Sequence, residues 1–474
     1  MGASIRQPHV WGVALLSLLA WFLVVYAYPF PAIMSDSGDY VLRAQKQMPG
    51  VFRPFGYSWF LMKLHTVVQS ARGLSLTQLL LHIGALIYFL QAIRHCFQPV
   101  SRALNWLLTA FLALSPLHIY MANSILSDSL FASISLCWIA SGMFLLKRFH
   151  WLTFLFHLLA LFLAMKVRYT GIIYPAISVL IAVLGSDAIW KKLALAIIPC
   201  VLSVVFYTTT RQFMYKSFGV KTFSGFAGWQ MANNALHTFP YFELKPENIP
   251  DRNVRGLYEF VRLFSDTIYP APGVTTTGFM WENKKPLKQY FSQTIAAEKP
   301  SWAYGNRWLY AGLRYEDFGN YFIRKYPALF ARHFVLPNLK DVAYPPLGFL
   351  RTYQEIKQGK ETCEWFDLPK ETVPKARFPL YEKYVNPWLD VFCGAWNASN
   401  LLLVLAALFF RRRFRPEPLQ WRALLVWIAF IGLFAVFSAY ASTVEIRYLA
   451  PVYFVQVALT IVLAGRLLTK PKTV

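Results

Sequence analysis

Acidic residues are scarce in this chain of 474 residues, which has 23 aspartates and glutamates against 47 lysines and arginines. Charged residues of both signs make up only 15% of the sequence, whereas a soluble domain has about 25%. Hydrophobic residues make up 56%. This composition excludes an ordinary soluble protein and predicts a polytopic membrane protein. The chain also has no phosphate-binding Gly-rich loop, no CxxC pair and no HExxH motif.

Cysteine is rare as well, and the five cysteines do not make a disulfide framework. Cys96, Cys137 and Cys200 lie in or next to apolar runs and are predicted to pack as small core residues. Cys363 and Cys393 lie in or near the long polar region 211–388. They pair if that region faces an oxidising compartment and remain thiols otherwise, and both alternatives are open at this point.

Basic residues give the chain a formal net charge of +24, but they occur in short clusters between apolar runs, such as Lys147-Arg148 and Lys191-Lys192. This spacing is typical of the cytoplasmic loops of membrane proteins. A nucleic-acid-binding protein would gather them on one face. Nucleic acid is therefore not an expected partner.

Ten apolar runs are long enough to cross a bilayer, which takes about 20 residues each. They lie near 10–30, 76–95, 103–122, 129–147, 151–165, 172–190, 193–210, 389–410, 421–440 and 448–467. The predicted fold class is all-α, with about ten transmembrane helices. We expect the first run to be an uncleaved helix because it lacks a small-residue cleavage site, and residues 57–69 to lie on the membrane surface as an amphipathic segment.

Ten spans place both termini on one side of the membrane, and the basic clusters mark that side as the cytoplasm. The polar region 211–388 then forms a large, mostly helical, outward-facing domain. It separates an N-terminal membrane part, 1–210, from a C-terminal one, 389–474. The prediction is a multi-pass integral membrane protein with cytoplasmic termini.

Outside the polar region the chain has seven acids, and three of them lie at the outward ends of predicted spans. The seven are Asp36, Asp39, Asp128, Asp187, Asp390, Glu417 and Glu445. A carboxylate at the edge of a bilayer is costly, so Asp36, Asp39 and Asp128 need an explanation. Helix capping is one, with Asp36 and Asp128 as N-caps and Asp39 three residues into a helix. A shared site is the other, where one carboxylate is a general base and another binds a hydroxyl, a cation or a metal.

Five outward basic residues depart from the predominance of basic residues on the cytoplasmic side, namely Arg43, Arg53, Lys166, Arg168 and Arg447. They are candidates for binding an anion, although each can instead be an interfacial anchor. Arg447 is the strongest candidate because Glu445 beside it can orient it. The start of the next helix also adds backbone N–H donors for a phosphate.

Five short motifs in a fixed order carry a resemblance to a known family. They are Asp36-Ser37-Gly38-Asp39, Arg53-Pro54-Phe55-Gly56-Tyr57, Ser127-Asp128-Ser129-Leu130-Phe131, Arg168-Tyr169-Thr170-Gly171 and Glu445-Ile446-Arg447-Tyr448. The chain resembles the GT-C superfamily of integral-membrane glycosyltransferases, which includes protein O-mannosyltransferases and lipid A aminoarabinose transferases. The resemblance covers roughly 10–210 and 389–467 and does not extend to 211–388.

The resemblance implies an enzyme that moves a sugar from a polyprenyl-phosphate donor to an acceptor hydroxyl at the outer face, with inversion. It implies a location in a bacterial cytoplasmic membrane and an acceptor that is a lipid, a glycan or a protein. Asp36, or else Asp39, would be the base, Asp128 would assist, and Arg447 would hold the phosphate with Arg168, Arg53 and Lys166 nearby. A divalent metal is possible but not implied. Protein O-mannosyltransferases have an Asp-Glu pair where this chain has Asp36 and Asp39 three residues apart, so the roles of these two remain open.

Two other functions remain to be weighed against a transferase. A transporter or flippase for lipid-linked glycans should place charges near the membrane midplane and show internal repeats, and neither is evident in the sequence. An O-antigen polymerase or ligase would rely on outward arginines. Candidates for that role are Arg307, Arg314, Arg324 and Arg332.

Aromatic residues are dense in the polar region and are predicted mainly as core, with sugar stacking as the alternative. They include Trp229, Trp281, Trp302, Tyr304, Trp308 and Tyr310.

Overall fold

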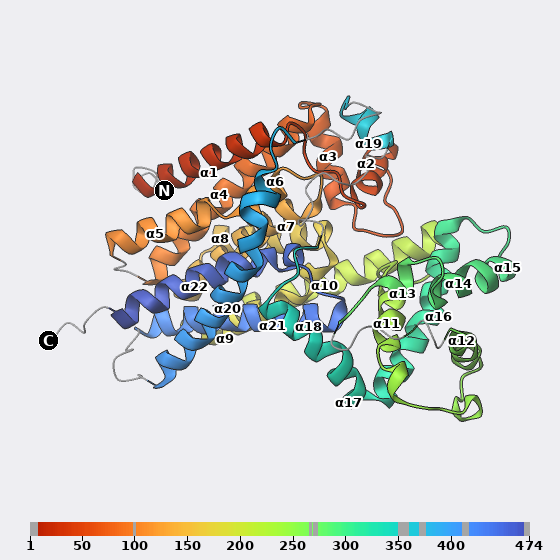
Figure 1. Ribbon diagram of the computed structural model, residues 1–474. Coiled ribbons are helices and arrows are strands. Elements are labelled where there is room, and N and C mark those ends of the chain that lie inside the picture. The colour runs from red at the N-terminus through yellow and green to blue at the C-terminus, as the bar shows by residue number, and fades with distance from the viewer. Residues whose placement is uncertain are drawn as a thin grey trace.

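The computed structural model describes residues 8–97, 101–264, 268, 274–348, 360–368, 376–409 and 417–468. Within these ranges every regular element is helical, and the β contribution is a single parallel bridge between Ala32 and Ser124. The predicted all-α architecture is therefore confirmed. A bundle of long apolar helices makes up most of the molecule, and a group of shorter helices lies at one end of it (Figure 1).

The bundle contains the apolar helices. They are α1 (Pro8–Ala27), α4 (Ala71–Phe97), α5 (Arg102–Ala113), α6 (Pro116–Ala122), α7 (Ser127–Lys147), α8 (Trp151–Val167), α9 (Pro175–Leu184), α10 (Ile189–Phe218), α20 (Asn386–Phe409), α21 (Pro418–Ala441) and α22 (Ala450–Leu468). Among the described residues, seven helices are long and apolar enough to cross a membrane, and three shorter apolar ones accompany them, Trp11–Ala27, Trp151–Val167 and Tyr169–Leu184. The multi-pass character is as predicted, but only seven of the ten predicted runs reach spanning length.

Two of the predicted runs are divided differently in the structure. The predicted run 172–190 is longer than the observed helix. Helix α9 ends at Leu184, and Trp190 already belongs to α10. Between the two helices, the carboxylate of Asp187 accepts a hydrogen bond from the backbone N–H of Phe149 at 2.9 Å. The run 103–122 is interrupted before Pro116, which opens α6 because proline is favoured at the first helical position.

The lateral surface of the bundle is apolar. Large apolar side chains on α1 and α10 are more than half exposed, namely Trp11, Leu15, Phe22, Val201 and Val204. Helices α7 and α22 lie in the centre of the bundle with most of their side chains buried. Helices that are apolar on every side suit a lipid environment, because exposed leucine, valine and phenylalanine would be costly in water.

A second hydrophobic core forms outside the bundle, in residues 219–348, here named the head region. Its helices are α11 (Ala227–Leu236), α12 (Arg252–Arg262), α13 (Gly278–Trp281), α14 (Pro286–Tyr290), α15 (Ala296–Glu298), α16 (Tyr304–Lys325), α17 (Pro327–Phe330) and α18 (Leu336–Ala343). Trp229, Trp308 and Tyr315 are fully buried between α11 and α16. Helix α10 runs past residue 210 to Phe218 and so leads directly into this region. Figure 1 shows α1 beginning and α22 ending at the end of the bundle away from α11–α16.

Two buried or nearly buried asparagines attach the head region to the bundle. Asn234 of α11 donates its side-chain amide to the carbonyls of Tyr440 and Ala441, at 3.1 Å each. Asn338 of α18 donates to the carbonyl of Ala439 at 3.0 Å. The last carbonyls of a helix have no partner within the helix, so these bonds satisfy the end of α21. They also fix the position of the loop that follows, residues 442–447.

Two short helices lie between α1 and α4, α2 (Ser37–Lys46) and α3 (Gly56–His65). The predicted surface segment 57–69 corresponds to α3. A further helix, α19 (Lys360–Trp365), packs on α2, and its Trp365 ring stacks on His65 with 4.0 Å between centroids. Cys363 and Cys393 are buried thiols, and no disulfide joins them.

Candidate functional site

The backbone brings the start of α2 beside the start of α7. Ala32 accepts a hydrogen bond from the N–H of Ile125 at 3.0 Å, as part of the isolated bridge. The hydroxyl of Ser37, which is fully buried, donates to the carbonyl of Ile125 at 2.8 Å. These bonds join segments that are distant in the sequence. As a result Asp36, just before α2, and Asp128, in the first turn of α7, lie at the same end of the bundle.

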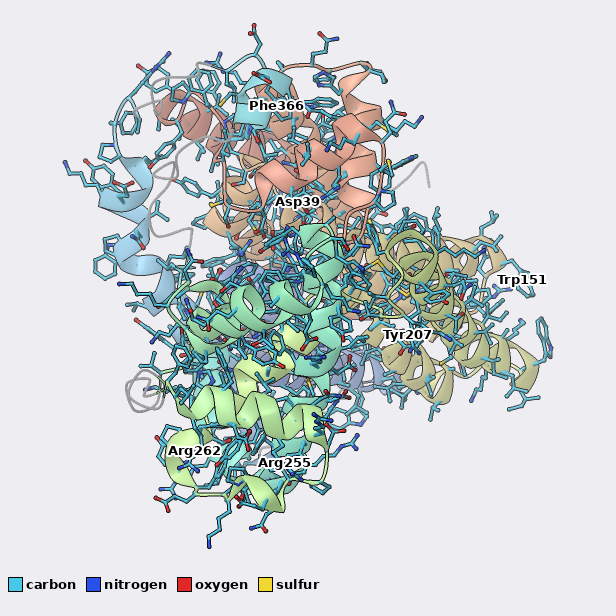
Figure 2. The ribbon with its side chains drawn as sticks, turned by 90° about the vertical axis from the view of Figure 1, so that its right-hand side faces the viewer. Asp39, Trp151, Tyr207, Arg255, Arg262 and Phe366 are labelled. Atoms are coloured by element: carbon cyan, nitrogen blue, oxygen red, sulfur yellow. The ribbon has the colours of Figure 1, made fainter. Side chains whose placement is uncertain are left out.

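Arg53 joins the two acids of the first loop. One guanidinium nitrogen, Nη2, lies 2.6 Å from Asp36 Oδ1, and the other, Nη1, lies 3.2 Å from Asp39 Oδ2. Asp39 is also paired with Arg43 one turn further along α2, at 3.3 Å. Figure 2 looks onto the head-region end of the molecule. It shows Asp39, a residue of α2, where α2 and α3 face the head region.

Arg447 joins the N-terminal acids to the C-terminal part of the chain. Its Nη1 lies 3.6 Å from Asp36 Oδ2 and 3.8 Å from Asp128 Oδ2. Its Nε donates to Glu445 at 2.9 Å, so Glu445 does orient Arg447. Arg168 forms a short ion pair with the other oxygen of Asp128.

We name this group the rim cluster. It consists of Asp36, Asp39, Asp128, Glu445, Arg53, Arg168 and Arg447. Within it, an oxygen of Asp36 and an oxygen of Asp128 both lie within 3.8 Å of one nitrogen. The structure therefore brings together Asp36, Asp39 and Asp128 with three of the four cations predicted to hold the donor phosphate.

Lys166 is the predicted cation that lies elsewhere. Its side chain is exposed, and its ammonium lies 5.4 Å from the ring centroid of Phe162 and 5.6 Å from that of Phe206. These are apolar side chains on the flank of the bundle. The contacts match the interfacial-anchor alternative.

Helix capping does not account for Asp36 or Asp128. Asp36 precedes α2, but its side chain makes no cap hydrogen bond. In α7 the capping position belongs to Leu126, and Asp128 lies inside the first turn. Both carboxylates instead face guanidinium groups, which offer stronger, charge-assisted hydrogen bonds than backbone N–H groups do. Asp39 lies in the first turn of α2, where the helix dipole favours an acid.

The acids differ in accessibility. The side chains of Asp36 and Asp39 are 22% and 19% exposed, whereas that of Asp128 is 2% exposed and that of Arg447 is 5% exposed. Asp36 and Asp39 are therefore more accessible from outside the protein than Asp128, whose carboxylate contacts Arg168 and Arg447.

Electrostatics keep Asp36 ionised. Burial favours the neutral carboxyl, but Arg53, Arg447 and Arg168 together outweigh burial, so the pKa of Asp36 lies below its usual value. A carboxylate held in this way is available to accept a proton.

A close backbone approach brings Arg53 towards Arg168. A Cβ on Gly56 would lie 2.3 Å from the carbonyl oxygen of Lys166, so only glycine fits where α3 meets the end of α8. Arg53 lies three residues before this contact, and Arg168 lies two residues after it. The glycine of the Arg53–Tyr57 motif therefore has a packing role.

Tyr448 was not identified from the sequence. Its hydroxyl accepts a hydrogen bond from Nη2 of Arg447 at 3.0 Å, and its ring lies 5.3 Å from the guanidinium carbon of Arg168. The repeated Arg-Tyr pairs, Arg168-Tyr169 and Arg447-Tyr448, offer a weak signal for it. Contacts between a guanidinium and a tyrosine ring contribute favourable electrostatic energy.

No metal site is evident in the part of the chain that the structure describes: no three His, Cys, Asp or Glu side chains converge as a metal ion would require. The carboxylates of the rim cluster face arginines. The charge of these acids is thus balanced by groups of the chain itself.

The fold resembles two solved membrane proteins. One is the archaeal oligosaccharyltransferase AglB from Archaeoglobus fulgidus, in complex with an inhibitory peptide and a dolichol-phosphate, with a TM-score of 0.44 and 13% identity over 95% of this chain. The chain covers half of that protein. The other is ArnT from Cupriavidus metallidurans bound to undecaprenyl phosphate, with a TM-score of 0.33 and 14% identity over 96% of this chain and 78% of ArnT. Neither a protein-family model nor a curated protein matches the sequence. Both likenesses are of structure, at low sequence identity.

Proposed function

We propose that this chain is a membrane glycosyltransferase that moves a sugar from a polyprenyl-phosphate donor to an acceptor hydroxyl at the outer face of the membrane. The observation that carries the proposal is the contact between Asp36 and Arg447, 3.6 Å apart at one end of an apolar bundle. A partly exposed carboxylate can take a proton from a hydroxyl. A buried guanidinium beside it can hold a phosphate that leaves.

The reaction is a single displacement. The acceptor oxygen forms a bond to the anomeric carbon while the bond from that carbon to the phosphate oxygen breaks, which inverts the anomeric centre. Asp36 receives the proton of the acceptor hydroxyl. The electron pair of the broken bond stays on the polyprenyl phosphate, whose charge Arg447 and Arg168 stabilise. Arg53 holds Asp36 in place, and Asp128 holds the two phosphate-binding arginines.

The same arrangement supports a proposal for the location. The apolar flank of the bundle accommodates the lipid tail of the donor, and the rim cluster lies where its phosphate would meet water. We place the head region and the cluster on the outer face of a bacterial cytoplasmic membrane, with the termini in the cytoplasm. The acceptor is a lipid, a glycan or a protein.

The polymerase or ligase alternative depends on outward arginines that act at one site. Arg314, Arg324 and Arg332 have separate surroundings in the structure. Arg314 is ion-paired with Glu298 at 2.8 Å. Arg324 and Arg332 are exposed on different helices, α16 and the segment after α17. The acids that a flippase would need inside the bundle are instead at its rim. A transferase accounts for more of the observed contacts than either alternative does.

The test is sugar transfer by the purified chain in liposomes that contain a polyprenyl-phosphate sugar. Asp36→Asn should lower turnover by roughly 10²–10⁴-fold, the usual contribution of a general base, while the protein remains folded and inserted. Asp128→Asn should lower turnover by a smaller factor than Asp36→Asn does. A suitable control is Asp187→Asn, because Asp187 is also a partly buried acid with a cation, Lys191, at 3.9 Å.

Three outcomes distinguish between the possible bases and between a transferase and a flippase. Loss of transfer in Asp39→Asn with normal transfer in Asp36→Asn would move the base to Asp39. Near wild-type turnover in both variants would show that neither aspartate is the general base, and the proposed catalysis would be wrong. Movement of the lipid-linked sugar across the bilayer without transfer would favour a flippase.

A further inference from the structure

The aromatic residues of the head region fall into two groups that the sequence does not separate. Trp229 and Trp308 are fully buried and stack face to face, with 3.8 Å between ring centroids. Trp281 and Tyr304 are 47% and 48% exposed. The first pair is core. The second pair lies directly on that core, because Trp281 stacks on Trp308 at 5.6 Å and Tyr304 lies 6.1 Å from Trp308.

A lysine lies among these rings. The ammonium of Lys288 is 4.7 Å from the ring centroid of Trp308, 5.9 Å from that of Trp281 and 5.8 Å from that of Tyr304. It donates to the hydroxyl of Tyr304 at 3.1 Å. An ammonium has three donors, so this bond leaves Lys288 with further donors for a ligand. Glu282 and Lys284 are both exposed and close to Trp281 in the chain, and they add one charge of each sign.

Ring contacts link the aromatic residues around Trp281 to the rim cluster. The ring centroids of Trp281 and Phe226 are 5.7 Å apart, and the guanidinium carbon of Arg53 lies 5.5 Å from the centroid of the Phe226 ring. Arg53 in turn holds Asp36. Phe52, next to Arg53, stacks on Phe226 at 5.5 Å, so the first loop is packed into the head region at this point.

We propose that Trp281, Tyr304 and Lys288 form an acceptor subsite that binds the sugar ring of an acidic glycan. The inference rests on the proposed transferase function and adds the class of its acceptor. A sugar ring has an apolar C–H face, which suits the exposed face of Trp281, and a polar edge, which suits hydroxyl and ammonium donors. The ammonium of Lys288, 5.9 Å from the centroid of the Trp281 ring, favours a glycan with carboxylate or phosphate groups. The path through Phe226 and Arg53 directs the next sugar of the chain towards Asp36.

The subsite can be tested by binding, without turnover. The Asp36→Asn protein in nanodiscs is titrated with an oligogalacturonate and a hyaluronan oligosaccharide as acidic probes, chitotetraose as a neutral probe, and a Ser/Thr-rich peptide. We expect the acidic oligosaccharides to bind more tightly than chitotetraose. Trp281→Ala should weaken that binding at least about tenfold, and Trp281→Phe should restore most of it, because a ring is retained. Lys288→Gln should remove the preference for acidic probes.

The matched control is Trp59→Ala, because Trp59 on α3 is 49% exposed, as Trp281 nearly is. This variant should bind the probes normally. Absence of binding by both acidic oligosaccharides, equal binding by Trp281→Ala, or binding of the peptide at the same residues would overturn the proposal. Glycan binding that depends on Trp281, together with no transferase activity in the wild-type protein, would keep the subsite and reject the proposed function, so the two failures are distinguishable.

Discussion

Arg447 and Asp36 are in contact, with Nη1 of the arginine 3.6 Å from Oδ2 of the aspartate, although they lie near opposite ends of the chain. Arg447 is also one of the cations that hold the pKa of Asp36 below its usual value. A donor phosphate that binds Arg447 competes with Asp36 for this cation. We therefore expect donor binding to raise the proton affinity of Asp36 at the stage when the proposed reaction requires a base.

Removal of the charge of Arg53 should shift the pH dependence of transfer. Arg53 is the largest of the cationic influences that lower the pKa of Asp36 against the opposing effect of burial. In Arg53→Gln that pKa should rise, so Asp36 becomes protonated, and inactive as a base, at a higher pH. The acid limb of the kcat/KM profile should move to higher pH in this variant. Arg53→Lys should shift it less, since the charge remains, and an unmoved acid limb in Arg53→Gln would contradict the assignment of Asp36.

Replacement of Arg447 should affect the donor more than the acceptor. A charge-assisted hydrogen bond to phosphate contributes about 2 kcal/mol, which is roughly 30-fold in affinity. Arg447→Ala should raise the donor KM by about that factor and leave the acceptor KM nearly unchanged. Arg447→Lys should recover only part of the loss, because lysine lacks the planar fork that contacts Glu445 and Tyr448. Equal effects on the two substrates would argue against a phosphate-binding role.

The attachment of the head region should depend on Asn338. This side chain is fully buried, donates to the carbonyl of Ala439 and accepts from the hydroxyl of Thr275 at 2.7 Å. Asn338→Ala leaves both groups without this partner, at a cost of about 1–3 kcal/mol each. We expect a lower unfolding temperature in detergent. Asn253→Ala, at an exposed position of α12, should leave the unfolding temperature unchanged.

Two glycine substitutions should have opposite effects on stability. In Gly56→Ala the new methyl group would meet the backbone carbonyl of Lys166 at 2.3 Å, so α3 must move away from α8. We expect lower thermal stability and weaker transfer, because Arg53 moves with α3. Gly256 lies within α12 with open space around it, and alanine is favoured over glycine in a helix by about 1 kcal/mol. Gly256→Ala should raise the unfolding temperature, and a fall in both variants would point to a cause other than the Lys166 contact.

Local chemistry explains which features could be predicted. The apolar helices were found because the length and hydrophobicity needed to cross a bilayer are properties of a single segment. Asp36 occupies the predicted N-cap position of α2, but its side chain makes no cap hydrogen bond. Aspartate before a helix is usually a cap, yet Asp36 turns to Arg53 because a guanidinium from another segment competes successfully with the backbone N–H groups.

The amino-acid sequence by itself determined that the chain is an all-helical membrane protein with a few acids and arginines at the ends of its apolar runs. These properties depend on composition and on residues that are neighbours in the chain. Only the tertiary structure decided that Asp36, Asp128 and Arg447 meet and that Lys166 lies elsewhere. It also decided which aromatics, Trp281 and Tyr304, are exposed. The reason is that ion pairing and burial depend on the packing of distant segments, here the bridge at Ala32 and the asparagines that hold the end of α21.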